Sequence, residues 1–124
     1  MQKLGKIAVT AFMVAGVLGL VVPAPALAQQ GPIKIGLVYP ITGPLAFQAV
    51  PMVNATKQAF DEENYTVAGR KVELLVEDSQ GKPDFGLTKF RKLVERDGVH
   101  LLKAELTTIV ALAAGSYVHA QKIP

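Results

Sequence analysis

The chain has 124 residues, with 13 Lys and Arg against 10 Asp and Glu, a formal net charge of +3 and no cysteine. The lack of cysteine excludes disulfide bonds and lipid attachment to a cysteine. Basic and acidic side chains are interleaved, so no concentrated basic face is available for a phosphate backbone, and we expect no nucleic-acid partner.

Residues 1–28 have the three parts of a secretory signal peptide. Two lysines precede an uncharged apolar stretch over residues 7–22, and a small-residue segment over 23–28 follows it. This order predicts export and cleavage after Ala28. The alternative is an uncleaved membrane anchor, because the apolar run is only a little shorter than the roughly 20 residues that cross a bilayer. Removal of the signal leaves residues 29–124 with a net charge of +1.

The first predicted elements are a strand and a helix. Residues 33–39 are mostly β-branched or large apolar residues, which predicts a buried strand that Pro40 ends, and residues 40–44 then form a turn. Apolar residues at three- and four-residue spacing predict a helix from about Ala49 to Asn64. Its expected apolar face consists of Met52, Ala55, Thr56, Ala59 and Phe60.

A second strand and helix follow a glycine-containing turn at residues 67–70. Residues 71–77 read as a strand, and Pro83 is well placed in the first turn of the next helix. That helix ends at Asp97, with Gly98 as a left-handed cap. Its expected apolar stripe consists of Leu87, Phe90, Leu93 and Val94.

The third predicted strand is shorter than the first two and is followed by a third helix. Residues 99–102 predict a strand that Lys103 closes, and Thr107 and Thr108 offer an N-cap to a helix that runs through Val118. The alternation of strands and helices predicts an α/β fold with a parallel sheet and right-handed crossovers.

The sequence gives little support for an enzyme. It contains no dinucleotide-binding or phosphate-binding glycine motif and no nucleophile elbow. His100 and His119 lack acidic companions at metal-ligand spacing, and they are interpreted as a strand residue and a helix-surface residue. Glu77-Asp78 is compatible with a metal or acid/base site, but a lone adjacent pair at a strand end is more typical of a solvated turn. We therefore expect no catalysis, no metal and no cofactor.

An ordered set of short motifs carries a family resemblance. The motifs are Thr42-Gly43-Pro44, Asp61-Glu62-Glu63-Asn64, Gly69-Arg70-Lys71-Val72-Glu73-Leu74, Glu77-Asp78 and Arg91-Lys92-Leu93-Val94-Glu95-Arg96-Asp97-Gly98-Val99. In this order they resemble the amino-terminal lobe of type I periplasmic binding proteins, which supply ABC transporters with branched-chain or related amino acids. The resemblance runs from about Ile33 to Pro124 and implies a three-layer α/β/α lobe.

The resemblance also implies a ligand site. In the family a loop at a helix start supplies a hydroxyl and N–H groups to the ligand, and the matching positions are Leu106, Thr107 and Thr108. Free N–H donors and the partial positive charge of a helix start suit a carboxylate. The alternative is that the two threonines only cap the helix. Phe47 and Gln48 match a loop that reaches the cleft, with ordinary loop packing as the alternative.

Several positions depart from the family pattern. Ala104-Glu105 stands in place of the usual Gly-Pro, Ile109 in place of a glycine, and Lys103 in a normally apolar strand. Family members have two domains of about 150 residues each, so residues 29–124 correspond to an incomplete amino-terminal lobe.

The resemblance implies a periplasmic solute-binding component of an ABC importer. Its ligand would be an amino acid or related small carboxylate, and its partner an ABC permease of the inner membrane. The alternative is a non-functional remnant, or a small exported interaction protein that binds no ligand.

Overall fold

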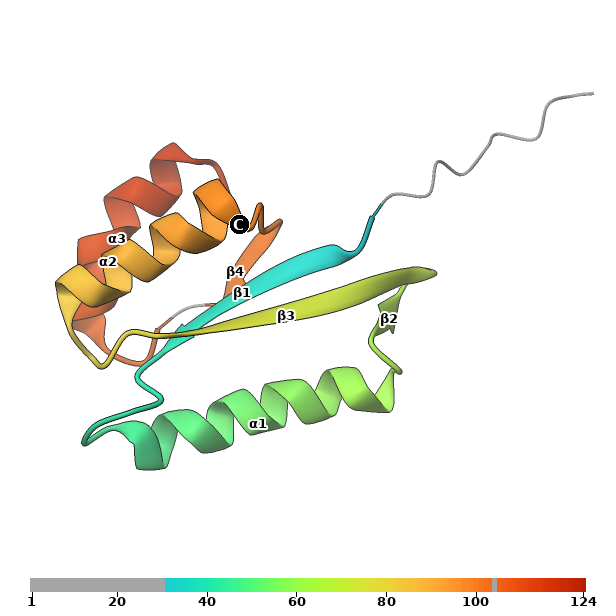
Figure 1. Cartoon of the computed structure of the whole chain (residues 1–124), viewed down its shortest axis with the longest axis horizontal. Helices are drawn as coiled ribbons and strands as arrows, with labels where there is room; N and C mark the ends of the chain where they lie inside the picture. The colour runs from blue at the N-terminus through green and yellow to red at the C-terminus, as the bar shows by residue number, and fades with distance from the viewer. Residues whose placement is uncertain (1–30, 104) are drawn as a thin grey trace, which may run out of the picture.

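The computed structural model describes residues 31–103 and 105–124 (Figure 1). The elements in chain order are β1 (Ile33–Tyr39), α1 (Ala46–Glu62), β2 (Thr66–Val67), β3 (Arg70–Asp78), α2 (Pro83–Arg91), the π-helical turn η1 (Lys92–Arg96), β4 (Leu101–Lys103) and α3 (Thr108–Ala120). The predicted signal peptide lies outside the described residues. Within them, no helix has both the length and the apolar character needed to cross a membrane.

The four strands form one sheet in the order β2-β3-β1-β4. β1 pairs in parallel with β3 on one side and with β4 on the other, whereas β2 pairs antiparallel with β3. The prediction of a parallel sheet is therefore wrong at this edge, where the sheet is mixed. Ala68 and Gly69 join β2 to β3 with positive φ angles of 49° and 77°, the backbone shape of a two-residue hairpin turn.

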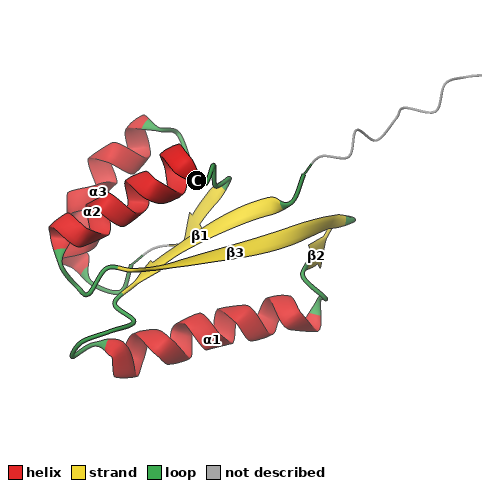
Figure 2. Cartoon of the chain, viewed as in Figure 1, coloured by secondary structure: helices red, strands yellow, loops and turns green. Residues whose placement is uncertain are grey.

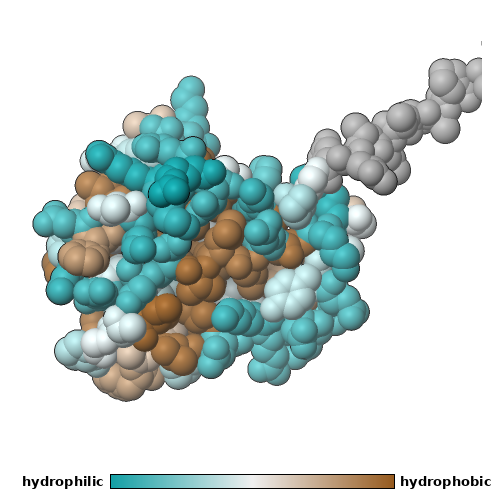
Figure 3. Space-filling model, in the orientation of Figure 1, coloured by the Kyte–Doolittle hydropathy of each residue, from teal (hydrophilic) through white to brown (hydrophobic). Residues whose placement is uncertain are grey.

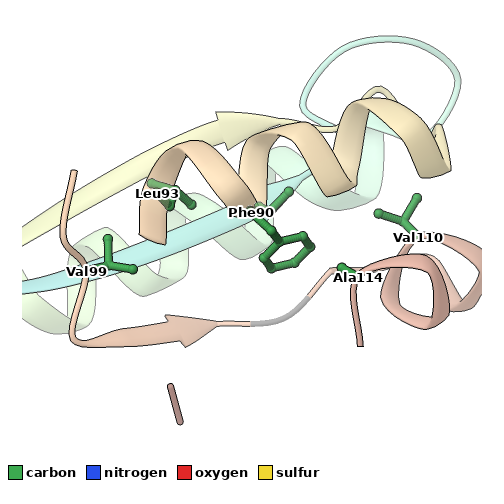
Figure 4. Packing of buried hydrophobic residues seen from close by; sticks show 6 residues of the cluster. Phe90, Leu93, Val99, Val110 and Ala114 are labelled. Carbon is green, nitrogen blue, oxygen red and sulfur yellow. The ribbon is translucent and has the colours of Figure 1, made fainter. Parts of the chain in front are cut away.

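Helices cover both faces of the sheet, which confirms the three-layer α/β/α arrangement (Figure 2). α2, η1 and α3 lie on one face and α1 lies on the other. Two clusters of buried apolar residues fill the layers. The cluster on the α2/α3 face consists of Val38, Phe90, Leu93, Val99, Val110 and Ala114 (Figure 4). The cluster on the α1 face consists of Leu37, Tyr39, Ala49 and Val53.

The helical segment after β3 changes geometry part-way. It is α-helical to Arg91 and then widens, because the N–H of Asp97 donates to the carbonyl of Lys92, five residues earlier, at 3.1 Å. Leu93 is fully buried in this turn. Gly98 follows with a φ of 65°, which confirms the predicted left-handed cap.

α1 differs from the prediction in its start and in its buried face. It begins at Ala46, three residues earlier than expected, and buries Ala49, Val53 and Thr56. Met52, in contrast, is 40% exposed. Together with Ala55, Ala59 and Phe60, Met52 lines an open groove beside β4, so most of the expected apolar face is not covered.

β4 also begins later than predicted, at Leu101 instead of Val99. Val99 is buried but lies in the connection before the strand.

His100 lies in the same connection, so its interpretation as a strand residue is wrong. Its N–H donates to the carbonyl of Lys34 at 2.8 Å, and its Nδ1 accepts from the N–H of Lys34 at 3.0 Å. His119 lies exposed on α3, as predicted.

Apolar surface remains visible between the two helical layers. Figure 3 shows hydrophobic residues in the middle of the molecule, above α1 and surrounded by hydrophilic surface. Leu74, Leu75 and Val76 of β3 are only partly buried, because two-residue β2 covers little of the outer edge of β3.

Candidate functional site

The carboxyl ends of β1, β3 and β4 meet at one edge of the sheet, since these strands run parallel. Three loops leave that edge, over residues 40–45, 79–82 and 105–107, and each leads to a helix (Figure 1). We call them the carboxyl-end loops. Open α/β sheets bind ligands at this edge.

Asp78 ties the first two carboxyl-end loops together. Its Oδ2 accepts from the hydroxyl of Thr42 at 2.5 Å, and its Oδ1 accepts from the N–H of Gln80 at 2.9 Å. Burial raises the pKa of Asp78, but the hydrogen bonds from Thr42 and from backbone N–H groups outweigh burial and hold the pKa below its usual value. Asp78 is therefore a structural carboxylate that accepts hydrogen bonds at neutral pH.

Ser79 fixes the second loop from within. It is fully buried, its N–H donates to the carbonyl of Tyr39 at 3.0 Å, and its Oγ accepts from the N–H of Gly81 at 3.2 Å. Gly81 has a φ of 69° and lies against Pro40 and Leu45 of the first loop. The two loops thus form one packed unit.

Glu77 points to the opposite face of the sheet from Asp78. Its carboxylate lies 2.8 Å from Lys89 and 2.6 Å from Lys92. Burial raises the pKa of Glu77, but the hydrogen bonds and charges of the two lysines outweigh burial and lower the pKa. The interpretation of Glu77-Asp78 as a solvated turn is therefore wrong, because both carboxylates are partly buried and engaged. Across residues 31–103 and 105–124, no three His, Asp or Glu residues gather as a metal site would require.

The third carboxyl-end loop leads to the start of α3. Thr107 is the N-cap residue, as predicted, but its hydroxyl makes no capping hydrogen bond. Thr107 Oγ1 is buried and has no partner within the described part of the chain. Thr108 is exposed as the first residue of α3, and Leu106 packs against the apolar cluster that contains Leu37 and Tyr39.

Glu105 accepts hydrogen bonds from backbone N–H groups of the same loop. Its Oε1 accepts from the N–H of Leu106 at 2.8 Å and from the N–H of Thr107 at 3.3 Å. Burial raises the pKa of the Tyr39 phenol, and the negative charge of Glu105 raises it further, so the two side chains are close enough to interact. From the sequence, Glu105 stands out only as a departure from the family pattern, and these hydrogen bonds are not predicted.

Phe47 and Gln48 lie in the first turn of α1 and not in the preceding loop. Both side chains are exposed, and Phe47 is 72% exposed. They lie at the same edge of the sheet as Thr107 and Thr108, since α1 and α3 both start there (Figure 1). Their part in ligand contact stays a prediction.

Comparison with known protein families covers all three carboxyl-end loops. Residues 32–124 match the profile of the family described as periplasmic binding protein. This chain belongs to the periplasmic binding protein family. A relative in that family, the Leu/Ile/Val-binding protein BraC3 of Rhizobium johnstonii, is 35% identical over 82 residues, which are 64% of this chain and 22% of the relative.

Solved structures of the periplasmic binding protein family share the fold. An ABC transporter substrate-binding protein from Sphaerobacter thermophilus superposes with a TM-score of 0.73 at 33% identity, over 75% of this chain and 25% of that protein. A solute binding protein from Rhodopseudomonas palustris BisB5, in complex with 3,4-dihydroxy benzoic acid, superposes with a TM-score of 0.73 at 30% identity. The match covers 77% of this chain and 26% of that protein. The chain therefore spans about a quarter of the length of these relatives.

Proposed function

We propose that this chain binds a small polar solute, such as an amino acid or related small carboxylate, at its carboxyl-end loops. It would do so in the periplasm, for an ABC permease of the inner membrane and without catalysis. One observation carries the proposal: in a chain of the periplasmic binding protein family, the start of α3 lies beside two interlocked loops at the carboxyl edge of the sheet.

The roles of the loop residues follow from their positions. The hydroxyls of Thr107 and Thr108 would hydrogen-bond the polar group of the solute at the start of α3. Leu106 would hold this loop on the core, since it packs against the α1-face cluster. Phe47 and Gln48, exposed in the first turn of α1, would supply an apolar surface and an amide to the same solute.

The open groove supports a second candidate, an exported interaction protein. The groove has a volume of about 700 Å³ and is bordered by α1 and β4. Its lining is mostly apolar and includes Met52, Leu101 and Leu102, with Lys103 at its border. Apolar surface of this kind is typical of contact with another protein.

Thermal unfolding of the protein purified after expression of all 124 residues distinguishes the two candidates. A panel of aliphatic amino acids and aromatic acids is added in turn, because a solute that binds only the native state raises the unfolding midpoint. At 100 times its dissociation constant a solute stabilises the native state by about 2.7 kcal/mol. A cooperative transition that no solute shifts contradicts solute binding and favours the interaction protein.

Two variants test the position of the solute. Thr107→Val keeps the size of the side chain and removes the hydroxyl, so we expect the shift to shrink. Thr66→Val is the matched control, because Thr66 lies in β2, away from the carboxyl-end loops, and its hydroxyl donates to the carbonyl of Asn64. Equal shifts in both variants would contradict a site at Thr107.

A further inference from the structure

Glu105 gives the third carboxyl-end loop an unusual charge. We propose that Glu105 determines the specificity of the site: it selects a solute whose group nearest α3 is a cationic N–H donor, such as an ammonium or amidinium, and disfavours a carboxylate there. This inference rests on the proposed function and names the class of solute more narrowly. An amino acid would bind with its ammonium group, and not its carboxylate, toward Glu105.

The backbone donors before α3 are already occupied. A helix start attracts a carboxylate through its free N–H groups. Here the N–H groups of Leu106 and Thr107 both donate to Glu105 Oε1. A solute carboxylate would have to displace this side chain and then lie beside its negative charge, and like charges at such a distance oppose each other.

Two oxygen atoms of the loop lack a hydrogen-bond donor. Glu105 Oε2 and Thr107 Oγ1 are both buried, and neither has a partner among residues 31–103 and 105–124. Buried polar atoms are normally paired, and unpaired ones call for an explanation. An ammonium group would supply up to three donors to these two acceptors. Protein atoms cover both oxygens, so binding of the cation requires a movement of this loop that exposes Oε2 while Oε1 keeps its hydrogen bonds to the backbone.

The charge of Glu105 has no counter-ion in the described part of the chain. The salt bridges of the described residues lie elsewhere: Lys89 and Lys92 are paired with Glu77. Lys103, two residues before Glu105, donates to the hydroxyl of Thr56 at 2.5 Å. Tyr39, whose pKa the charge of Glu105 helps to raise, is a neutral phenol at pH 7 and supplies no positive charge. A cation from the solute would balance the carboxylate.

Three probes with the same branched side chain separate the effect of an ammonium group from the effect of a carboxylate. Leucine carries both groups, 3-methylbutylamine keeps only the ammonium, and 4-methylpentanoate keeps only the carboxylate. Benzamidine and benzoate form a second pair of equal shape and opposite charge. Calorimetric titration of the protein purified after expression of all 124 residues, at pH 7, gives the dissociation constants. We expect the cationic member of at least one pair to bind ten-fold or more tightly than the anionic member.

Variants at Glu105 connect this preference to the side chain. Glu105→Gln keeps the shape and removes the charge, so we expect the ratio of cation to anion affinity to fall at least ten-fold. Glu105→Asp keeps the charge and should retain part of the preference. Glu73→Gln is the matched control, because Glu73 is an exposed residue of β3. It should leave the ratio unchanged.

The outcomes separate this inference from the proposed function. Anionic probes that bind the wild-type protein as tightly as their cationic partners overturn the inference and leave solute binding intact. An unchanged ratio in Glu105→Gln does the same. If no probe and no amino acid binds a cooperatively folded wild-type protein, the proposed function fails and the inference fails with it. A Glu105→Gln variant that does not fold leaves the wild-type ratio and Glu105→Asp to decide.

Discussion

The two faces of the sheet differ in how completely they are covered. On the α2/α3 face, two helices and η1 enclose a cluster of six buried residues (Figure 4). On the α1 face a single helix covers four buried residues, and the adjoining groove lined by Met52 and Leu101 stays open. The comparison indicates that the α2/α3 face supplies most of the stability. The α1 face contributes Tyr39 and the packing of Leu106, and so supports the third carboxyl-end loop.

The largest expected effect is at the centre of the α2/α3 face. Phe90 is 4% exposed, and Phe90→Ala would leave a cavity between α2, β1 and α3. We expect the free energy of unfolding to fall by about 3–5 kcal/mol, measured by urea denaturation. Phe47→Ala is the matched control: Phe47 is 72% exposed, so its loss should cost less than about 0.5 kcal/mol. Similar losses in the two variants would contradict the difference between the faces.

A smaller effect is expected where α2 meets α3. Gly86 is buried, and a Cβ atom added there would overlap the Cγ1 of Val110. Gly86→Ala should therefore destabilise the protein by about 1–3 kcal/mol, as overpacking does.

Gly115→Ala, in the neighbouring helix α3, is expected to stabilise the protein instead. An added Cβ at Gly115 meets no atom within 4 Å, and the residue lies inside α3. We expect stabilisation of about 0.5–1 kcal/mol, because alanine is the better helix former. Thermal unfolding of both variants measures the contrast, and a stabilising Gly86→Ala would mean that the helices are not in close contact.

The smallest effect concerns the link between the first two carboxyl-end loops. Asp78→Asn weakens the hydrogen bonds from Thr42 and Gln80, and we expect a loss of about 1 kcal/mol at pH 7. The folded protein lowers the pKa of Asp78, so this contribution is present above the unfolded pKa of about 4 and is lost as the pH falls through the folded pKa.

Urea denaturation at pH 7 and below pH 4 checks this sign. The difference between wild type and Asp78→Asn should shrink as the pH falls. Asp61→Asn is the control, since Asp61 is exposed on α1. A difference that grows at low pH would show that Asp78 is protonated in its hydrogen-bonded state.

The local sequence pattern is sufficient to predict the helices and strands that have a strong periodic signal. β1 has the predicted bounds of Ile33–Tyr39, because a mostly apolar run ends at a proline. The stripe of the second helix is confirmed, with Phe90 and Leu93 buried. β2 was missed, because two residues carry no periodic signal and only the pairing with β3 defines them.

Local pattern failed where tertiary contacts choose between equivalent faces. Both faces of α1 carry apolar residues at helical spacing, and the sheet buries Ala49 and Val53 instead of Met52 and Ala59. The site shows the same limit. Thr107 was placed correctly at a helix start, but the hydrogen bonds of Glu105 to the backbone next to it depend on loop geometry that spacing does not reveal.

The most direct test of the account is to locate a bound solute by amide chemical-shift mapping of the isotope-labelled protein during titration with leucine and 3-methylbutylamine. The account predicts that the perturbed amides cluster in the carboxyl-end loops, at Thr42, Gln80 and Leu106 to Thr108. Shifts confined to the groove residues Met52 and Leu101, or no shifts at millimolar solute, would contradict it.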